Sequence, residues 1–163
     1  MTIYFDHNAK TPVDPEVFEA MRPYLEGEFG NASCHYGLGV RAAYVIEKAR
    51  RFTARLINAR EEEIVFTSGG TESDNLASGG IVLGTGKKHV ITSCIEHPAV
   101  LNTCRFLEDC LGCRITRLPV DSWGFIDPAD VEKAIGSETA LVSIMAANNE
   151  IGSIQPISEI AAI

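Results

Sequence analysis

The chain has 163 residues, of which 45% are hydrophobic and 22% are charged, as in an ordinary globular domain that can bury a core. This composition excludes a disordered tail, a collagen and a coiled coil, and the net charge of −8 argues against general nucleic-acid binding. No apolar run is long enough to span a membrane, and the N-terminus lacks a basic-then-apolar secretory signal. We therefore expect a soluble, cytoplasmic protein.

The cysteines favour a reducing compartment. Their number is odd, at five, and no secretory signal precedes them, which indicates free thiols rather than disulfides. Cys110 and Cys113 have the C-x-x-C spacing, but they lie at the end of a predicted helix instead of opening one, so chance spacing is favoured over a redox pair. Cys34 and His35 add too few ligands for a metal centre, and we predict none.

The N-terminal part of the chain predicts two helices. Asp14 and Pro15 are typical of an N-cap and a first helical position, and they open a helix that runs to about Leu25. A loop follows over Phe29–Gly39. Apolar residues then recur at helical spacing from about Val40 to Asn58, which predicts a long amphipathic helix.

From there on, strands and helices alternate. The predicted strands are Glu63–Thr67, His89–Ser93, Arg114–Val120 and Ala140–Met145, and the predicted helices are Thr71–Leu83, Pro98–Leu111 and Pro128–Ile135. Short β-branched runs are typical of strands covered on both faces, so the fold class should be α/β, a mostly parallel open sheet with flanking helices. We expect no internal domain boundary over residues 1–163. A helix starts near Pro156, and because it has no C-cap we expect the chain to be part of a longer protein.

Two glycines separate a predicted strand from a predicted helix in Thr67–Ser73. Glycines let a backbone approach a ligand, and helix N-terminal N–H groups favour an anion, so Gly70 and Thr71 are candidates for binding a phosphate. The segment matches neither a Walker A loop nor the dinucleotide fingerprint. An ordinary turn with Thr71 as a cap is the alternative.

Two more polar clusters follow predicted strands. His97 lies between Glu96 and Pro98, where it either faces a ligand or merely caps a helix. Asn148 and Asn149 lie after the last predicted strand, where amides bind polar ligands or form turns. All three clusters follow carboxyl ends of parallel strands, where open α/β sheets bind ligands. Together, a phosphate site, an imidazole and an amide fit a pyridine cofactor with a phosphate tail.

The segments FDHNAKTPVDPEVFEAMRPYL, FGNAS, EIVFTSGGTESDNLA, EHPAVLNTC, ETALVSIMAANNEIG and QPISEI resemble cysteine desulfurases of the NifS/IscS type, in order and over essentially the whole chain. The resemblance implies the N-terminal part of the large domain of the fold-type I pyridoxal 5′-phosphate (PLP) transferase fold. It further implies a homodimer that removes sulfur from L-cysteine, gives alanine, and passes an enzyme persulfide to a sulfur acceptor or iron–sulfur scaffold protein.

The same resemblance assigns roles to four residues. Gly70 and Thr71 would hold the cofactor phosphate. His97 would stack on the pyridine ring and help to move protons, which makes it the candidate catalytic residue. Asn149 would lie by the cofactor hydroxyl and the substrate carboxylate.

The chain also departs from the family pattern. Lys10 stands where the family has threonine, and Ala32 stands where it has the proline of an Asn-Pro turn. No Ser-x-His-Lys segment is present to supply the Schiff-base lysine, and no cysteine matches the position that carries the persulfide. We therefore expect the chain to be inactive alone. The alternatives are a selenocysteine lyase or another class V aminotransferase-like enzyme, and a non-catalytic half-chain that pairs with a partner.

Overall fold

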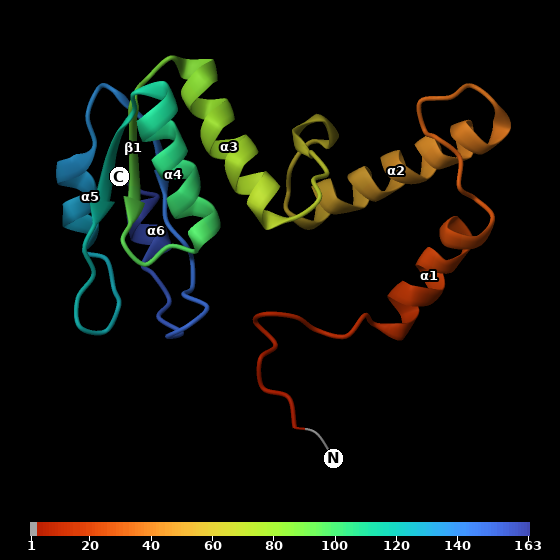
Figure 1. Ribbon diagram of the computed structural model, residues 1–163, viewed down its shortest axis with the longest axis horizontal. Coiled ribbons are helices and arrows are strands. Elements are labelled where there is room, and N and C mark those ends of the chain that lie inside the picture. Colours follow the sequence, from red (N-terminus) through yellow and green to blue (C-terminus); the bar gives the residue numbers. More distant parts are fainter. Residues whose placement is uncertain (1–2) are drawn as a thin grey trace. The chain divides into compact units, whose positions relative to one another are not determined.

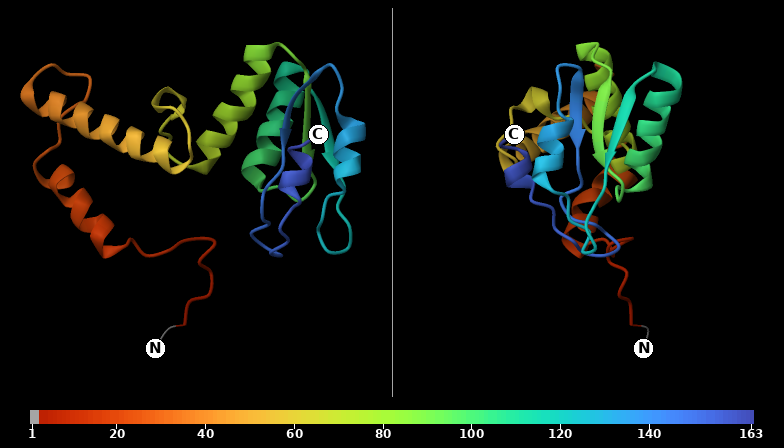
Figure 2. Two further views of the ribbon diagram at one scale, coloured as in Figure 1. Left: turned by 180° about the vertical axis from the view of Figure 1, so that it is seen from behind. Right: turned by 90° about the vertical axis from the view of Figure 1, so that its left-hand side faces the viewer.

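The computed structural model describes residues 3–163. Its contacts divide the chain into two compact units, and the first ends at Phe66 and the second begins at Thr67. Figure 1 shows the helices and strands along the chain, and Figure 2 gives two further views. The division concerns packing within this chain, and the expectation of no domain boundary over residues 1–163 stays a prediction.

The N-terminal unit contains two helices and a short 3-10 turn. They are α1 (Pro15–Glu26), α2 (Gly37–Leu56) and η1 (Glu61–Glu63). The predicted start of α1 is confirmed, because the Asp14 carboxylate accepts a hydrogen bond from the N–H of Glu16 at 2.8 Å and Pro15 is the first helical residue. Helix α2 starts at Gly37, before the predicted Val40.

The predicted strand at Glu63–Thr67 is wrong. Glu63 closes the η1 turn instead, where its carboxylate accepts a hydrogen bond from the backbone N–H of Arg60 at 2.7 Å. Residues 64–67 join no strand, and the carbonyl of Ile64 is bound by the guanidinium of Arg50 on α2. The short apolar run resembled a strand, but a strand forms only where a neighbour pairs with its backbone.

The C-terminal unit is a parallel sheet with helices around it, as predicted. Its elements are α3 (Gly70–Thr85), β1 (His89–Ser93), α4 (Pro98–Leu111), β2 (Arg114–Leu118), α5 (Pro128–Ala134), β3 (Thr139–Ser143) and α6 (Ile157–Ile160). The strand order is β2-β1-β3, and both pairings are parallel. Because β1 and β3 are parallel neighbours, the loops that follow them lie at the same edge of the sheet.

The core of this unit lies on both faces of β1. Val90 packs with Leu107 of α4 and with Val82 of α3, and all three side chains are fully buried. The next residue, Ile91, packs in a second cluster with Val131 of α5. Successive strand residues point to opposite faces, so β1 is covered on both sides, as its continuous apolar run predicted.

His89 joins all three strands at the amino end of the sheet. Its side chain is buried, and its two ring nitrogens lie 2.8 Å from the hydroxyls of Thr139 on β3 and Thr116 on β2. Burial, with a smaller contribution from the charge of Arg114, lowers the pKa of His89 below its usual value of 6.5.

This lowered pKa predicts that acid destabilises the chain. As the pH falls below about 6.5, the unfolded chain takes up a proton on His89 before the folded chain does, so the free energy of unfolding decreases. We expect a lower melting temperature at pH 5 than at pH 7.5, and a smaller difference in His89→Gln, whose amide does not titrate. An equal pH dependence in the variant would assign the effect to other groups.

Candidate functional site

The first turn of α3 faces open space. Gly69 is the N-cap and brings no side chain to the first N–H groups of the helix. A Cβ atom added to Gly69 or Gly70 would meet no atom of the chain within 4 Å, so packing within this chain does not require either glycine. An uncapped helix start with room in front of it favours an anion.

The turn before α3 is held by its own side chains. The carboxylate of Glu72 accepts hydrogen bonds from the N–H and the hydroxyl of Ser68, at 2.7 and 2.6 Å, and these bonds lower the pKa of Glu72. The hydroxyls of Thr67 and Ser73 lie 2.7 Å apart. The hydroxyl of Thr71 takes no part in these bonds, and its residue is exposed.

His97 is the N-cap of α4, one of the two roles considered for it. Its Nδ1 atom accepts a hydrogen bond from the N–H of Ala99 at 3.1 Å, and Pro98 is the first residue of the helix. Because Nδ1 accepts, a neutral ring carries its proton on Nε2. His97 is exposed, so capping leaves Nε2 and the ring accessible to a ligand.

The two asparagines after β3 differ in role. Asn148 is buried, and its oxygen accepts from the N–H groups of Glu150 and Ile151 at 2.8 and 3.0 Å, as in a turn former. Its amide also donates to the carbonyl of Ile95 at 3.0 Å. Asn149 is exposed, and its amide donates to the carboxylate of Glu150 at 3.0 Å.

Glu96 also joins these two loops. Its side chain is buried, and its Oε1 atom accepts from the hydroxyl of Ser93 at 2.7 Å and from the N–H of Met145 at 2.8 Å. The bonds thereby tie the end of β1 to the segment that follows β3. The sequence pointed only to His97 in this part of the chain, because an acidic residue in a loop resembles a surface residue.

A third loop is fixed to the loop after β3. The buried side chain of Gln155 donates to the carbonyl of Gly124 at 2.6 Å and accepts from the N–H of Ile126 at 2.9 Å. Gly124 has φ +83°, and a Cβ there would lie 2.5 Å from Cδ1 of Ile151. Trp123, beside it, is 77% exposed.

The structure therefore brings together the loops that carry His97 and Asn149. Gly70 and Thr71 stand at the start of α3, which packs against α4 and β3. Helices α3 and α4 begin toward the end of the sheet at which β1 and β3 finish (Figure 1). That all four residues line one site stays a prediction.

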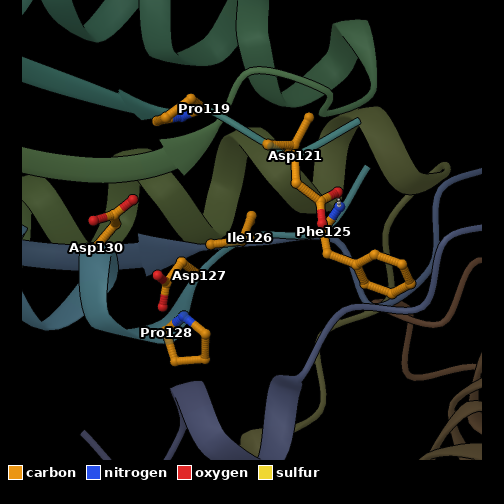
Figure 3. A pocket seen from close by; sticks show the side chains of 8 residues that line it. Pro119, Asp121, Phe125, Ile126, Asp127, Pro128 and Asp130 are labelled. Carbon is orange, nitrogen blue, oxygen red and sulfur yellow. Dashed lines mark hydrogen bonds between the residues drawn. The ribbon is translucent and has the colours of Figure 1, made fainter. Parts of the chain in front are cut away.

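A pocket of about 510 Å³ lies beside α5, and Figure 3 shows its side chains. Its three carboxylates already have partners. Asp121 accepts from the N–H groups of Trp123 and Phe125, Asp127 caps α5, and Asp130 lies 2.9 Å from the ammonium of Lys133. Among residues 3–163, no group of three or more His, Cys, Asp or Glu is arranged to hold a metal ion. The pocket therefore offers no second candidate site.

Residues 3–163 match the family model described as aminotransferase class-V. The chain belongs to this family. Over 163 residues it is 52% identical to the cysteine desulfurase IscS of Dictyoglomus turgidum and 51% identical to that of Methanosarcina thermophila. Each match covers 99% of this chain. It spans only 41% and 40% of these two relatives.

Solved structures share the fold of this chain. A NifS-like protein matches with a TM-score of 0.94 at 40% identity, over 99% of this chain and 45% of that one. SspA, solved in complex with cysteine, matches with a TM-score of 0.92 at 42% identity, over 99% of this chain and 47% of that one. The predicted fold class and family resemblance are thereby confirmed. In the described part of the chain, no helix is long and apolar enough to cross a membrane.

Proposed function

We propose that this chain contributes the phosphate-binding and ring-stacking residues of a PLP-dependent cysteine desulfurase, which removes sulfur from L-cysteine and leaves alanine. The observation that carries the proposal is the open, uncapped start of α3. The similarity to cysteine desulfurases over the whole chain supports it.

The residues present fit the cofactor. The glycines at 69 and 70 leave space that no atom of the chain fills, as a bound phosphate requires, and the first N–H groups of α3 would donate to it. The Thr71 hydroxyl would add one more donor. When bound, PLP would supply the electron sink that stabilises negative charge at the substrate α-carbon.

His97 and Asn149 would contact different parts of the cofactor. The exposed imidazole would stack on the pyridine ring, and its Nε2 atom would hold or release a proton. Asn149 would orient the cofactor hydroxyl and the substrate carboxylate. The hydrogen bonds between their loops support a fixed separation between the two residues.

We propose cofactor binding without turnover for the 163-residue chain by itself. The lysines of the C-terminal unit are engaged elsewhere: Lys87 donates to the carbonyl of Thr139, Lys88 to that of Leu111, and Lys133 pairs with Asp130. Burial raises the pKa of the Cys104 thiol, which disfavours the nucleophilic thiolate.

The proposal extends to compartment and partners. The five cysteines at 34, 94, 104, 110 and 113 are all free, which supports a reducing cytoplasm. The desulfurase would act as a homodimer and pass its sulfur to an acceptor or iron–sulfur scaffold protein.

Pyridoxine 5′-phosphate tests the site directly, because it lacks the aldehyde and cannot react with amines. Titrated into the ¹⁵N-labelled chain, it should shift the amide signals of Gly70 and Thr71. Thr71→Ala should weaken its binding about tenfold, as expected for one hydrogen bond to a charged group.

Thr85→Ala is the matched control. Thr85 lies in the last turn of the same helix, and its hydroxyl donates to the carbonyl of Ile81 at 2.7 Å. This variant should bind like the unmodified chain. Equal binding of pyridoxine with and without its phosphate, or equal losses in the two threonine variants, would contradict the proposed phosphate site.

A further inference from the structure

A buried carboxylate stands directly before the candidate catalytic histidine. The Glu96 residue is 6% exposed, and no ion pair to it is present among the described residues. Burying a carboxylate costs free energy unless hydrogen bonds replace the lost water. The two bonds it accepts, from Ser93 and Met145, supply that replacement. The side chain is therefore held in one geometry.

Both bonds go to the same oxygen, one from the end of β1 and the other from the segment after β3. Ser93 ends β1, while Met145 lies just beyond β3. The amide of Asn148 adds a third bond, to the carbonyl of Ile95. The loop of residues 94–97 is thus fixed to the loop that follows β3 by two bonds, one to the carboxylate of Glu96 and one from the side-chain amide of Asn148.

His97 depends on this arrangement. Its ring accepts a hydrogen bond from the N–H of Ala99 in its own helix, and that bond sets its tautomer but not its distance from Asn149. The distance follows from the bonds between the loops. We propose that Glu96 is a positioning residue of the cofactor site, an inference that rests on the proposed function. Its Oε1 atom fixes the His97 ring relative to Asn149.

The proposal concerns hydrogen-bond geometry, not charge. A glutamine at position 96 keeps an oxygen that accepts from both Ser93 and Met145, and it removes the charge. An alanine removes both bonds and leaves the Met145 N–H without its partner. Glu96→Gln should therefore preserve the site, and Glu96→Ala should not.

The first measurements are made on the chain without any cofactor. In the ¹⁵N-labelled 163-residue chain, Glu96→Ala should speed hydrogen exchange of the Ala99 amide about tenfold and shift the ring signals of His97 and the side-chain amide of Asn149. Glu96→Gln should leave all three as they are. Ser93→Ala, which removes one of the two bonds, should shift the same signals by a smaller amount. It replaces Glu96→Ala as the test variant if Glu96→Ala fails to fold.

His89→Ala is the matched control, because it also removes two hydrogen bonds of a buried side chain, at the opposite end of β1. It should lower stability and leave the His97 and Asn149 signals in place. Pyridoxine 5′-phosphate should then bind about tenfold more weakly to Glu96→Ala and within about twofold to Glu96→Gln.

The positioning role is overturned if the His97 and Asn149 signals stay unchanged in both Glu96→Ala and Ser93→Ala, if Glu96→Gln behaves like Glu96→Ala, or if His89→Ala moves them equally. Failure of the phosphate compound to bind the unmodified chain contradicts the proposed function alone, since the first readout does not involve it.

Discussion

In hydrogen exchange, the backbone amides of residues 3–66 should exchange at least about a thousandfold faster than those of β1 in the 163-residue chain. Local opening without a buried core costs close to nothing, whereas the amides of a core strand exchange only with opening that costs several kcal/mol. The contrast follows from how little the N-terminal unit buries.

Helix α1 has no buried residue, and α2 has only Gly39 and Ala54. The large apolar side chains of the unit are instead exposed, among them Phe18 of α1 and Phe52 of α2. Short helices are marginal in water unless they pack an apolar face. In contrast, all five residues of β1 are buried.

Exchange followed by mass spectrometry resolves the two regions, and limited proteolysis provides an independent measurement. A protease of broad specificity should cut within α1 and α2 and leave a stable product that contains α3 to α6. Slow exchange throughout residues 3–66 would show that this unit is stable without a larger core, contrary to the argument from burial.

Replacing Leu107 by alanine should lower the free energy of unfolding of the C-terminal unit by about 2–5 kcal/mol. Leu107 is fully buried on α4 and packs in the cluster that contains Val90 and Val82. Truncation removes buried apolar surface and leaves a cavity between α3, α4 and the sheet. Since domains are stable by only about 5–15 kcal/mol, a large part of the unit's stability would be lost.

Urea denaturation measures the loss as a shift of the midpoint at constant slope. Leu83→Ala is the control, because Leu83 is on the neighbouring helix α3 but is 67% exposed. That variant should change stability by less than about 0.5 kcal/mol. Equal effects of the two substitutions would show that the α3–α4 cluster is not the core of the unit.

The elements with explicit start and stop signals were predictable. Helix α4 runs from Pro98 to Leu111 as expected, because proline opens it and Gly112 ends it in the left-handed conformation. Strand β1 also has its predicted bounds, since its apolar run is flanked by polar residues. The interactions that bound α4 are local in sequence, whereas β1 also needs its pairing with β2 and β3.

Features that depend on distant partners were not predictable in the same way. The short apolar run in Glu63–Thr67 is compatible with a strand, but residue pattern alone does not reveal whether another strand pairs with it. Glu96 and Asn148 likewise resemble surface residues until the pairing of β1 with β3 brings their partners close. For the site, sequence reasoning could name His97 and Asn149 but not what holds their loops together.

The exposed loop beside Gln155 determines what fluorescence can report about this protein. Trp123 is the single tryptophan, and it is already in contact with water when the chain is folded. Its emission should therefore change little on unfolding of the core. Its loop follows β2 and is bound through Gly124 to Gln155, so the indole is an intrinsic optical probe of the carboxyl edge of the sheet.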